Sequence, residues 1–195
     1  MHIVTPNHIR WREAISVQFG FSGIDSFEAV MLARRRLKAQ FPNLDKPRQC
    51  VYVVRLRGQV AVAYGSRISP TIYIGEGNAA GRLYAHANWI ADLLVAVPNA
   101  AIEIKVADCV RKNDNNLCQY VEADLLATFV ERYKCLPWFN RQRERKHEGK
   151  RQYDETVIKQ FKQRIGKVQG SNYLWAIRPT PNNPQFAHYD TGWYG

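Results

Sequence analysis

Arg82 and His86 are a pair of side chains whose chemistry suggests a reaction. They lie four residues apart in "GRLYAHANW", a segment with helical spacing, so both side chains point the same way. An arginine can hold a phosphate through two hydrogen bonds, and a histidine can accept or donate a proton near neutral pH. The pair could therefore face a phosphate together. The alternative is that both are ordinary surface residues.

Glu122 interrupts an apolar helical face. Leu125, Leu126 and Phe129 follow it by three, four and seven residues, so all four side chains share one side of the predicted helix. Burying a carboxylate there is costly unless a cation, a metal ion or hydrogen-bond donors compensate. The alternative is a position near the first turn, where a negative charge is favourable and the side chain reaches solvent.

Three more polar residues interrupt apolar segments. Tyr52 and Tyr73 lie in β-branched runs, where a tyrosine is usually a core residue with its hydroxyl hydrogen-bonded. Asn140 follows Pro137 and two aromatic residues, where an amide commonly forms a turn or a cap. Taken singly, none of the three indicates a function.

The elements that would position these residues are strands and helices in mixed order. Strands are predicted at residues 50–56, 59–64, 71–75, 101–106 and 173–178, the first three as a meander. Helices are predicted at residues 7–19, 25–41, 77–94, 117–136 and 154–165. In the second helix Asp25 and Glu28 suit a capping box. Its predicted apolar stripe consists of Phe27, Val30, Met31, Leu37 and Phe41.

Positive charge lies mainly at the two ends of this 195-residue chain, whose net charge is +11. Residues 1–50 hold 8 Lys and Arg against 4 Asp and Glu, residues 51–140 hold 9 against 8, and residues 141–170 hold 10 against 4. Basic arms around a neutral centre suit a polyanion, because each neutralised phosphate releases counterions. A solvated surface that maintains solubility is the alternative.

The remaining composition indicates a soluble, cytoplasmic protein. No apolar run is long enough to span a bilayer, and the N-terminus has no features of a secretion signal. The cysteines lack the spacing of a zinc site, so free thiols in a reducing compartment are expected. They are Cys50, Cys109, Cys118 and Cys135.

The order of the motifs resembles the GIY-YIG nuclease superfamily, and its restriction-endonuclease branch in particular. The motifs are "VY" at 51–52, "YIG" at 73–75, "RL" at 82–83 with His86 after it, Glu122 in a helix, and "LPWFN" at 136–140. The likeness covers roughly residues 50 to 141. The first motif reads Cys50-Val51-Tyr52, so its glycine is absent.

The resemblance implies an α+β fold, in which a small three-stranded antiparallel sheet is flanked by helices. Residues 1–48 would be a helical extension, residues 49–141 the catalytic domain, and residues 142–195 a basic extension packed on it. The implied activity is hydrolysis of phosphodiesters in double-stranded DNA by a type II restriction or mobile-element endonuclease. A palindromic target would imply a homodimer.

The resemblance also assigns roles to the site residues. Glu122 would hold one Mg²⁺ or Mn²⁺ ion, and Arg82 would hold the scissile phosphate. Tyr52 would be the general base, or would orient the attacking water, with its pKa lowered by the metal and by His86. Tyr73 would hydrogen-bond in the same pocket, and Asn140 would fix neighbouring groups. The candidate contacts to the DNA backbone are Arg34, Arg35, Arg36, Lys38, Arg141, Arg143, Arg145 and Lys146.

Two other functions remain open at this stage. The missing glycine at position 50 would suit a nucleic-acid-binding module that keeps the fold without the reaction. A ribonuclease on the same fold is the second, because nothing in the sequence indicates how a 2′-hydroxyl would be recognised.

Overall fold

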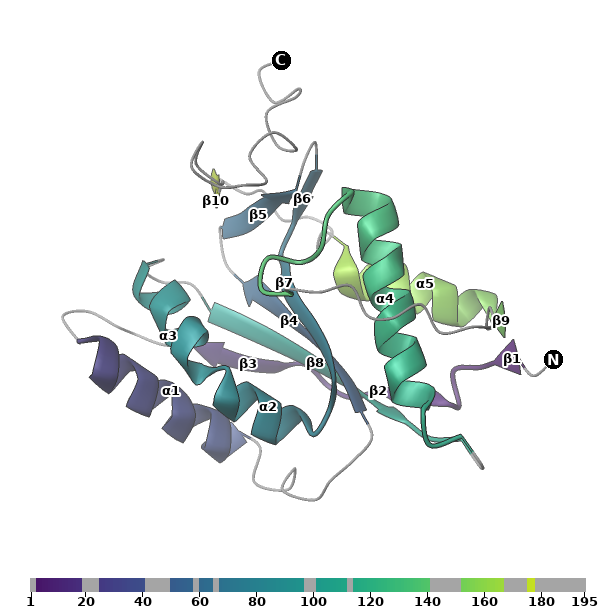
Figure 1. The fold of residues 1–195 in the computed structure, drawn as a ribbon, viewed down its shortest axis with the longest axis horizontal. Coiled ribbons are helices and arrows are strands. Elements are labelled where there is room, and N and C mark those ends of the chain that lie inside the picture. The colour runs from purple at the N-terminus through teal and green to yellow at the C-terminus, as the bar shows by residue number, and fades with distance from the viewer. Residues whose placement is uncertain are drawn as a thin grey trace, which may run out of the picture.

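The computed structural model gives an α+β fold in which a mixed set of strands is combined with helices (Figure 1). The structure describes residues 3–18, 25–40, 50–57, 60–64, 67–96, 101–111, 114–140, 152–166 and 175–177. None of the helices in these ranges is both long and apolar enough to cross a membrane.

The central sheet is built on three long antiparallel strands in the order β8, β4, β7. Two short strands, β2 and β3, pair with β8 on its other side. The bounds of these five strands are β2 Ile9–Trp11, β3 Ile15–Gln18, β4 Cys50–Arg57, β7 Thr71–Gly77 and β8 Ala101–Cys109. The sheet therefore has five strands rather than the three predicted.

The helix predicted at residues 7–19 is wrong. The two added strands occupy this segment instead. Ile9 and Val17 are buried, and both belong to strands that pair with β8. Arg12 forms a two-bond ion pair with Asp108 of β8, with N···O distances of 2.7 and 2.8 Å. These contacts span more than eighty residues of sequence, so local helical spacing could not reveal them.

The predicted meander is also wrong in its connectivity, although its strands exist. β4 pairs directly with β7, because β5 (Val60–Tyr64) leaves the central sheet. β5 pairs instead with β6 (Arg67–Ser69) and with β10 (Trp175–Ile177) in a separate three-stranded sheet. Since β4 has β8 and β7 on its two sides, it has no edge left for β5.

Two groups of helices cover the central sheet (Figure 1). α1 (Ser26–Gln40), α2 (Ala79–Ala85) and α3 (Ala87–Ala96) pack against one another. α4 (Leu117–Tyr133) packs against β7 and against α5 (Glu155–Ile165). A small parallel pair of strands, β1 (Ile3–Val4) and β9 (Gln152–Tyr153), joins the beginning of the chain to the start of α5.

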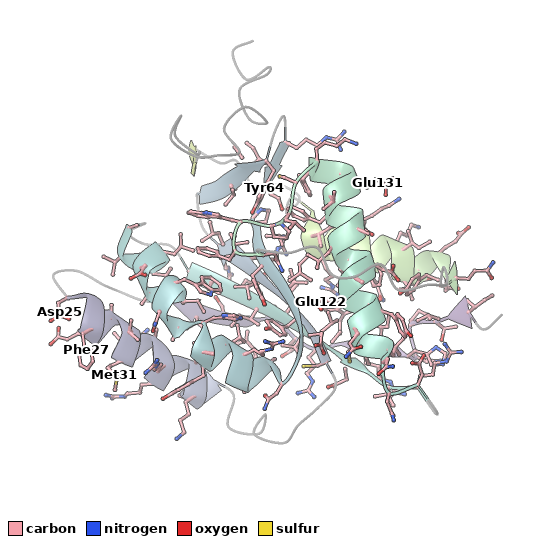
Figure 2. The ribbon with its side chains drawn as sticks, viewed as in Figure 1. Asp25, Phe27, Met31, Tyr64, Glu122 and Glu131 are labelled. Atoms are coloured by element: carbon pink, nitrogen blue, oxygen red, sulfur yellow. The ribbon has the colours of Figure 1, made fainter. Side chains whose placement is uncertain are left out.

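The buried face of α1 differs from the predicted stripe. The predicted cap is present, since Asp25 Oδ1 accepts a hydrogen bond of 2.8 Å from the backbone N–H of Glu28. The buried residues of α1 are Ala29, Ala33 and Leu37. Leu37 belongs to the predicted stripe, whereas the two alanines do not. Phe27 and Met31 are 74% and 49% exposed, and both lie off the buried face of the helix (Figure 2). Alanines allow α1 to approach α3 closely, which larger side chains would prevent.

A buried ion pair connects the central sheet to the end of α5. Arg55 of β4 donates a hydrogen bond of 3.0 Å to Glu103 of β8, and another of 2.9 Å to the carbonyl of Gly166. Lys105 lies 3.6 Å from the second oxygen of the same carboxylate. Glu103 therefore compensates two cations that have little access to water.

Replacing Glu103 by alanine should strongly destabilise the protein. The substitution Glu103→Ala leaves the buried Arg55 guanidinium without its carboxylate, which costs about 3 kcal/mol in the free energy of unfolding. Urea unfolding followed by circular dichroism measures this loss. The matched control is Glu131→Ala on the exposed side of α4, which we expect to change stability by about 0.5 kcal/mol or less. Equal losses in the two variants would contradict the structural role of the pair.

Candidate functional site

Tyr52 and Tyr73 lie on neighbouring strands and place two phenol rings together. Their ring centroids are 5.9 Å apart with an interplanar angle of 29°. Tyr52 is fully buried in β4. Its partner across the β4–β7 ladder is Gly75 of the "YIG" motif. The "YIG" motif thus supplies the ring of Tyr73, and its glycine leaves the space that the ring of Tyr52 occupies.

The absence of a side chain at Gly75 makes this arrangement possible. A Cβ atom at this position would lie 2.6 Å from the Tyr52 hydroxyl oxygen and 2.7 Å from Cε1 of Tyr73. Both distances are shorter than van der Waals contacts allow. The glycine is therefore required by close packing of the two rings.

The Tyr52 hydroxyl is a buried polar atom with no hydrogen-bond partner in the described part of the chain. Burial raises the pKa of Tyr52 far above its ordinary value, and the neighbouring Tyr73 and Glu122 raise it further. Arg82 acts in the opposite direction. These surroundings keep the phenol neutral, whereas the sequence-based expectation was that His86 would help lower its pKa. That part of the expectation is corrected.

Arg82 belongs to the short helix α2 and acts on the Tyr52 phenol from there. The helix begins at Asn78, whose side chain accepts a hydrogen bond of 3.1 Å from the backbone N–H of Gly81. Leu83 is buried on the inner side of α2, and Arg82 is exposed. The guanidinium lies close enough to favour the ionised form of Tyr52 and the neutral form of His86.

His86 lies at the junction between α2 and α3, where the single helix predicted at residues 77–94 is interrupted. Its ring centroid is 4.8 Å from that of Tyr73 and 5.5 Å from that of Trp89. Burial, and to a lesser degree the charge of Arg82, lowers the pKa of His86 below its ordinary value of 6.5. The imidazole is therefore neutral at pH 7, and its Nε2 atom is buried without a partner in the described residues.

The lowered pKa of His86 should make stability depend on pH. As pH falls through 6.5, the unfolded chain binds a proton at this residue while the folded protein does not. The free energy of unfolding should therefore decrease from about pH 7.5 to about pH 5.5. Thermal unfolding at both pH values measures the decrease, which should be smaller in His86→Asn. An identical decrease in the variant and the wild type would show that His86 is not responsible.

Glu122 lies on α4 among apolar neighbours and is 6% exposed. Figure 2 shows it on the side of this helix that faces the sheet. Because α4 begins at Leu117, Glu122 is beyond the first turn, and the alternative of a solvent-exposed carboxylate near the helix start is wrong. Its charge also raises the pKa of Tyr52, as the weakest of the influences on this phenol.

Asn140 acts on the site through the backbone of β7. Its Nδ2 donates to the carbonyl of Ile74 at 2.7 Å, and its Oδ1 accepts from the N–H of the same residue at 3.0 Å. The backbone N–H of Phe139 also donates to the carbonyl of Ile72 at 2.9 Å. Asn140 thus holds the strand between Tyr73 and Gly75 and is a positioning residue.

A series of aromatic rings extends from the surface to Tyr73 and Tyr52, and the sequence did not predict it. Trp138 is exposed and stacks on Phe139, whose centroid lies 4.1 Å from that of Trp89. Trp89 contacts Tyr73 in turn, with centroids 6.1 Å apart. Only the fold joins these rings, because the first and last lie far apart in the sequence.

The remaining predicted residues lie away from this cluster. Arg34, Arg35 and Lys38 line a separate groove between α1 and α2, and Arg36 is exposed on the same helix. Arg141, Arg143, Arg145 and Lys146 lie outside the described residues.

The four cysteines are free thiols. Cys50, in place of the motif glycine, is buried and donates a hydrogen bond of 2.7 Å to the carbonyl of Gly77. Burial raises the pKa of Cys50 to about 11, so this thiol is protonated at neutral pH.

Glu122 is the residue that could hold a lightly coordinated divalent ion. Within the described ranges, no three His, Cys, Asp or Glu side chains gather as a ready-made metal site. Glu122 supplies one carboxylate, and the unpartnered Tyr52 hydroxyl lies near it. A hard cation such as Mg²⁺ is commonly held by one or two carboxylates together with water and substrate phosphates.

Comparison with protein-family models, curated proteins and solved structures found no match to this chain.

Proposed function

We propose that this protein is a divalent-metal-dependent endonuclease that hydrolyses phosphodiester bonds in double-stranded DNA. The observation that carries the proposal is the stacking of Tyr73 from β7 on Tyr52, together with the charges of Arg82 from α2 and Glu122 from α4, which shift the Tyr52 pKa in opposite directions. A buried carboxylate and an exposed arginine that both act on one phenol suit metal-assisted cleavage of a phosphate ester.

Each group has a role that its surroundings support. Arg82 is exposed and binds the scissile phosphate, whose developing charge it stabilises. Glu122 holds the cation, Mg²⁺ or Mn²⁺, which when bound neutralises phosphate charge and lowers the pKa of water. Tyr52 is a neutral and fully buried phenol, so it donates its hydrogen bond to groups inside the site and positions them rather than contacting the substrate.

His86 is the group best suited to accept a proton. Its imidazole is neutral at pH 7 and has a buried nitrogen without a partner among the described residues. A neutral imidazole is a more effective base at this pH than a phenol with a raised pKa. Tyr73 contacts both Tyr52 and His86 and fixes their relative positions.

A plasmid digestion tests the activity directly. Purified protein should cut mixed plasmid DNA when Mg²⁺ or Mn²⁺ is added, and an excess of chelator should stop the reaction. Mapping the ends distinguishes a restriction enzyme, which leaves a fixed sequence, from an unspecific nuclease. A palindromic site would indicate a homodimer. Transfer RNA digested in parallel would reveal a ribonuclease instead.

A non-cleaving nucleic-acid-binding module is the second candidate. The observation that favours it is Cys50 at the position of the first motif glycine, where its thiol is committed to Gly77. Tight DNA binding without turnover in either metal would support this module and contradict the endonuclease.

A further inference from the structure

A groove of about 420 Å³ between α1 and α2 is separate from the candidate site. Its lining contains three cations and no carboxylate. The lining residues are Met31, Arg34, Arg35, Lys38, Ala39 and Tyr84. Such a lining attracts an anionic partner.

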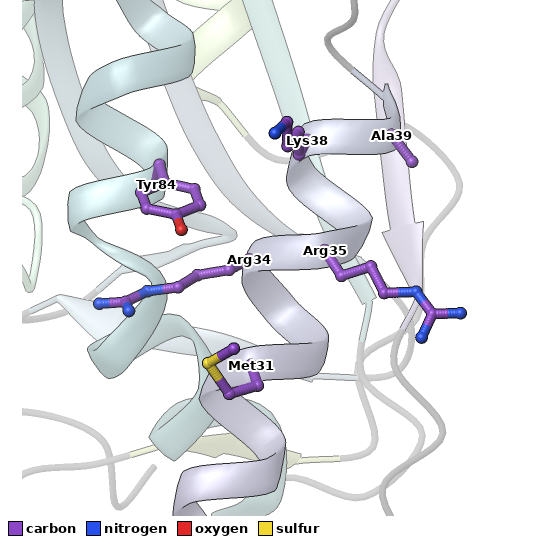
Figure 3. Close-up of a pocket in the computed structure, with 6 residues that line it drawn as sticks. All are labelled: Met31, Arg34, Arg35, Lys38, Ala39 and Tyr84. Atoms are coloured by element: carbon purple, nitrogen blue, oxygen red, sulfur yellow. The ribbon is translucent and has the colours of Figure 1, made fainter.

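The groove follows from the spacing of residues on α1. Met31, Arg34 and Lys38 are three and four residues apart, so they share a face beside the buried alanines. Figure 3 shows Arg34 extending from α1 toward α2 and passing next to Tyr84, while Arg35 points away from α2. Arg34 and Lys38 are therefore the cations of the groove proper.

The groove combines charge with exposed apolar surface. The guanidinium carbon of Arg34 lies 5.1 Å from the Tyr84 ring centroid. Its Nε atom is buried without a hydrogen-bond partner in the described residues. Tyr84 and Met31 remain 46% and 49% exposed. A free phosphate would use only the cations, whereas a nucleotide would also use the ring and the thioether.

We propose that this groove binds an unpaired nucleotide of the substrate strand, with its phosphate against Arg34 and Lys38 and its base against Tyr84 and Met31. Stacking requires a free base face, which a base pair inside a duplex does not offer. The assignment to a substrate strand rests on the proposed function, because α2 carries both Tyr84 and Arg82 of the candidate site. A strand crossing α2 could contact both.

Fluorescence anisotropy with labelled oligodeoxythymidine, and with the same strand paired to oligodeoxyadenosine, tests the groove. Chelator is present so that no cleavage occurs. Single-strand binding by the wild type should depend on Tyr84 more strongly than duplex binding does, because only an unpaired base can stack on its ring. Tyr84→Ala should weaken single-strand binding roughly tenfold, and Tyr84→Phe should retain it. Arg34→Gln should weaken binding far more than Lys159→Gln, which removes the same charge from exposed α5.

Wild-type affinity in Tyr84→Ala, or equal losses in Arg34→Gln and Lys159→Gln, would overturn the groove as a nucleotide site. An equal effect of Tyr84→Ala on single-strand and duplex binding would also overturn it. Thermal unfolding of each variant shows that the fold is kept. Plasmid cutting by the same proteins separates the two proposals. If the wild type cuts plasmid but Tyr84→Ala binds DNA as the wild type does, only the groove proposal is contradicted. If binding depends on the groove residues but no protein cuts plasmid, only the endonuclease proposal is contradicted.

Discussion

Glu122→Gln should abolish metal-dependent cleavage while the protein stays folded. Glutamine keeps the shape of a side chain that is 6% exposed, but it loses the charge that holds a divalent cation. Loss of metal-assisted stabilisation should reduce the rate of plasmid cutting by about a thousandfold or more. Initial rates at saturating Mg²⁺, measured beside the wild type, give the effect.

Stability provides the second readout for this substitution. We expect the melting temperature of Glu122→Gln to stay close to that of the wild type, because glutamine keeps the size of the buried side chain and one of its hydrogen-bond acceptors. Glu131→Gln, on the exposed side of the same helix, is the matched control and should cut at the wild-type rate. Cutting by Glu122→Gln at the wild-type rate would rule out this residue as the metal ligand.

Gly75→Ala should disrupt the candidate site from within the sheet. The new methyl group would overlap the Tyr52 hydroxyl and the Tyr73 ring, and fully buried Tyr52 has no free space into which to move. Overpacking of this kind costs about 1–3 kcal/mol in stability. A displacement of about 1 Å at a reacting group can reduce the rate by about a hundredfold. Chemical denaturation and plasmid cutting measure the two effects.

Gly81→Ala is the matched control, since it adds the same methyl group in the neighbouring helix. Its Cβ would meet the Asn78 side chain at ordinary distances of 3.5 Å and more. Alanine is also preferred over glycine within a helix by about 0.5–1 kcal/mol. We therefore expect Gly81→Ala to be as stable as the wild type or more so. Comparable loss of activity in both variants would contradict the packing explanation at Gly75.

The parts of the fold that the sequence predicts are those with strong local patterns. β4, β7 and β8 follow from β-branched runs, and α4 and α5 follow from helical spacing. β2 and β3 could not be predicted in this way, because their partner β8 lies about ninety residues away. On α1, Phe27 indicated the wrong core face, since alanines provide the close approach to α3 that decides the packing.

The candidate site was predictable as a set of residues and not as a geometry. Motif order proposed Tyr52, Arg82 and Glu122, and in the structure the charges of Arg82 and Glu122 both act on the Tyr52 phenol. The direction of the Tyr52 pKa shift depends on its complete burial, which no motif specifies. Trp89 was missed because its position beside Tyr73 is fixed only by the break between α2 and α3.

The hydrogen bonds that Phe139 and Asn140 make to β7 limit how copies of this protein can associate. β7 is the outermost strand on its side of the central sheet, and an open edge of this kind readily recruits a strand from another molecule. Backbone groups of Ile72 and Ile74 are already occupied by the chain's own "FN" dipeptide. Two protomers therefore cannot extend the central sheet by pairing along β7 at Ile72 and Ile74, so any association of copies has to use another surface.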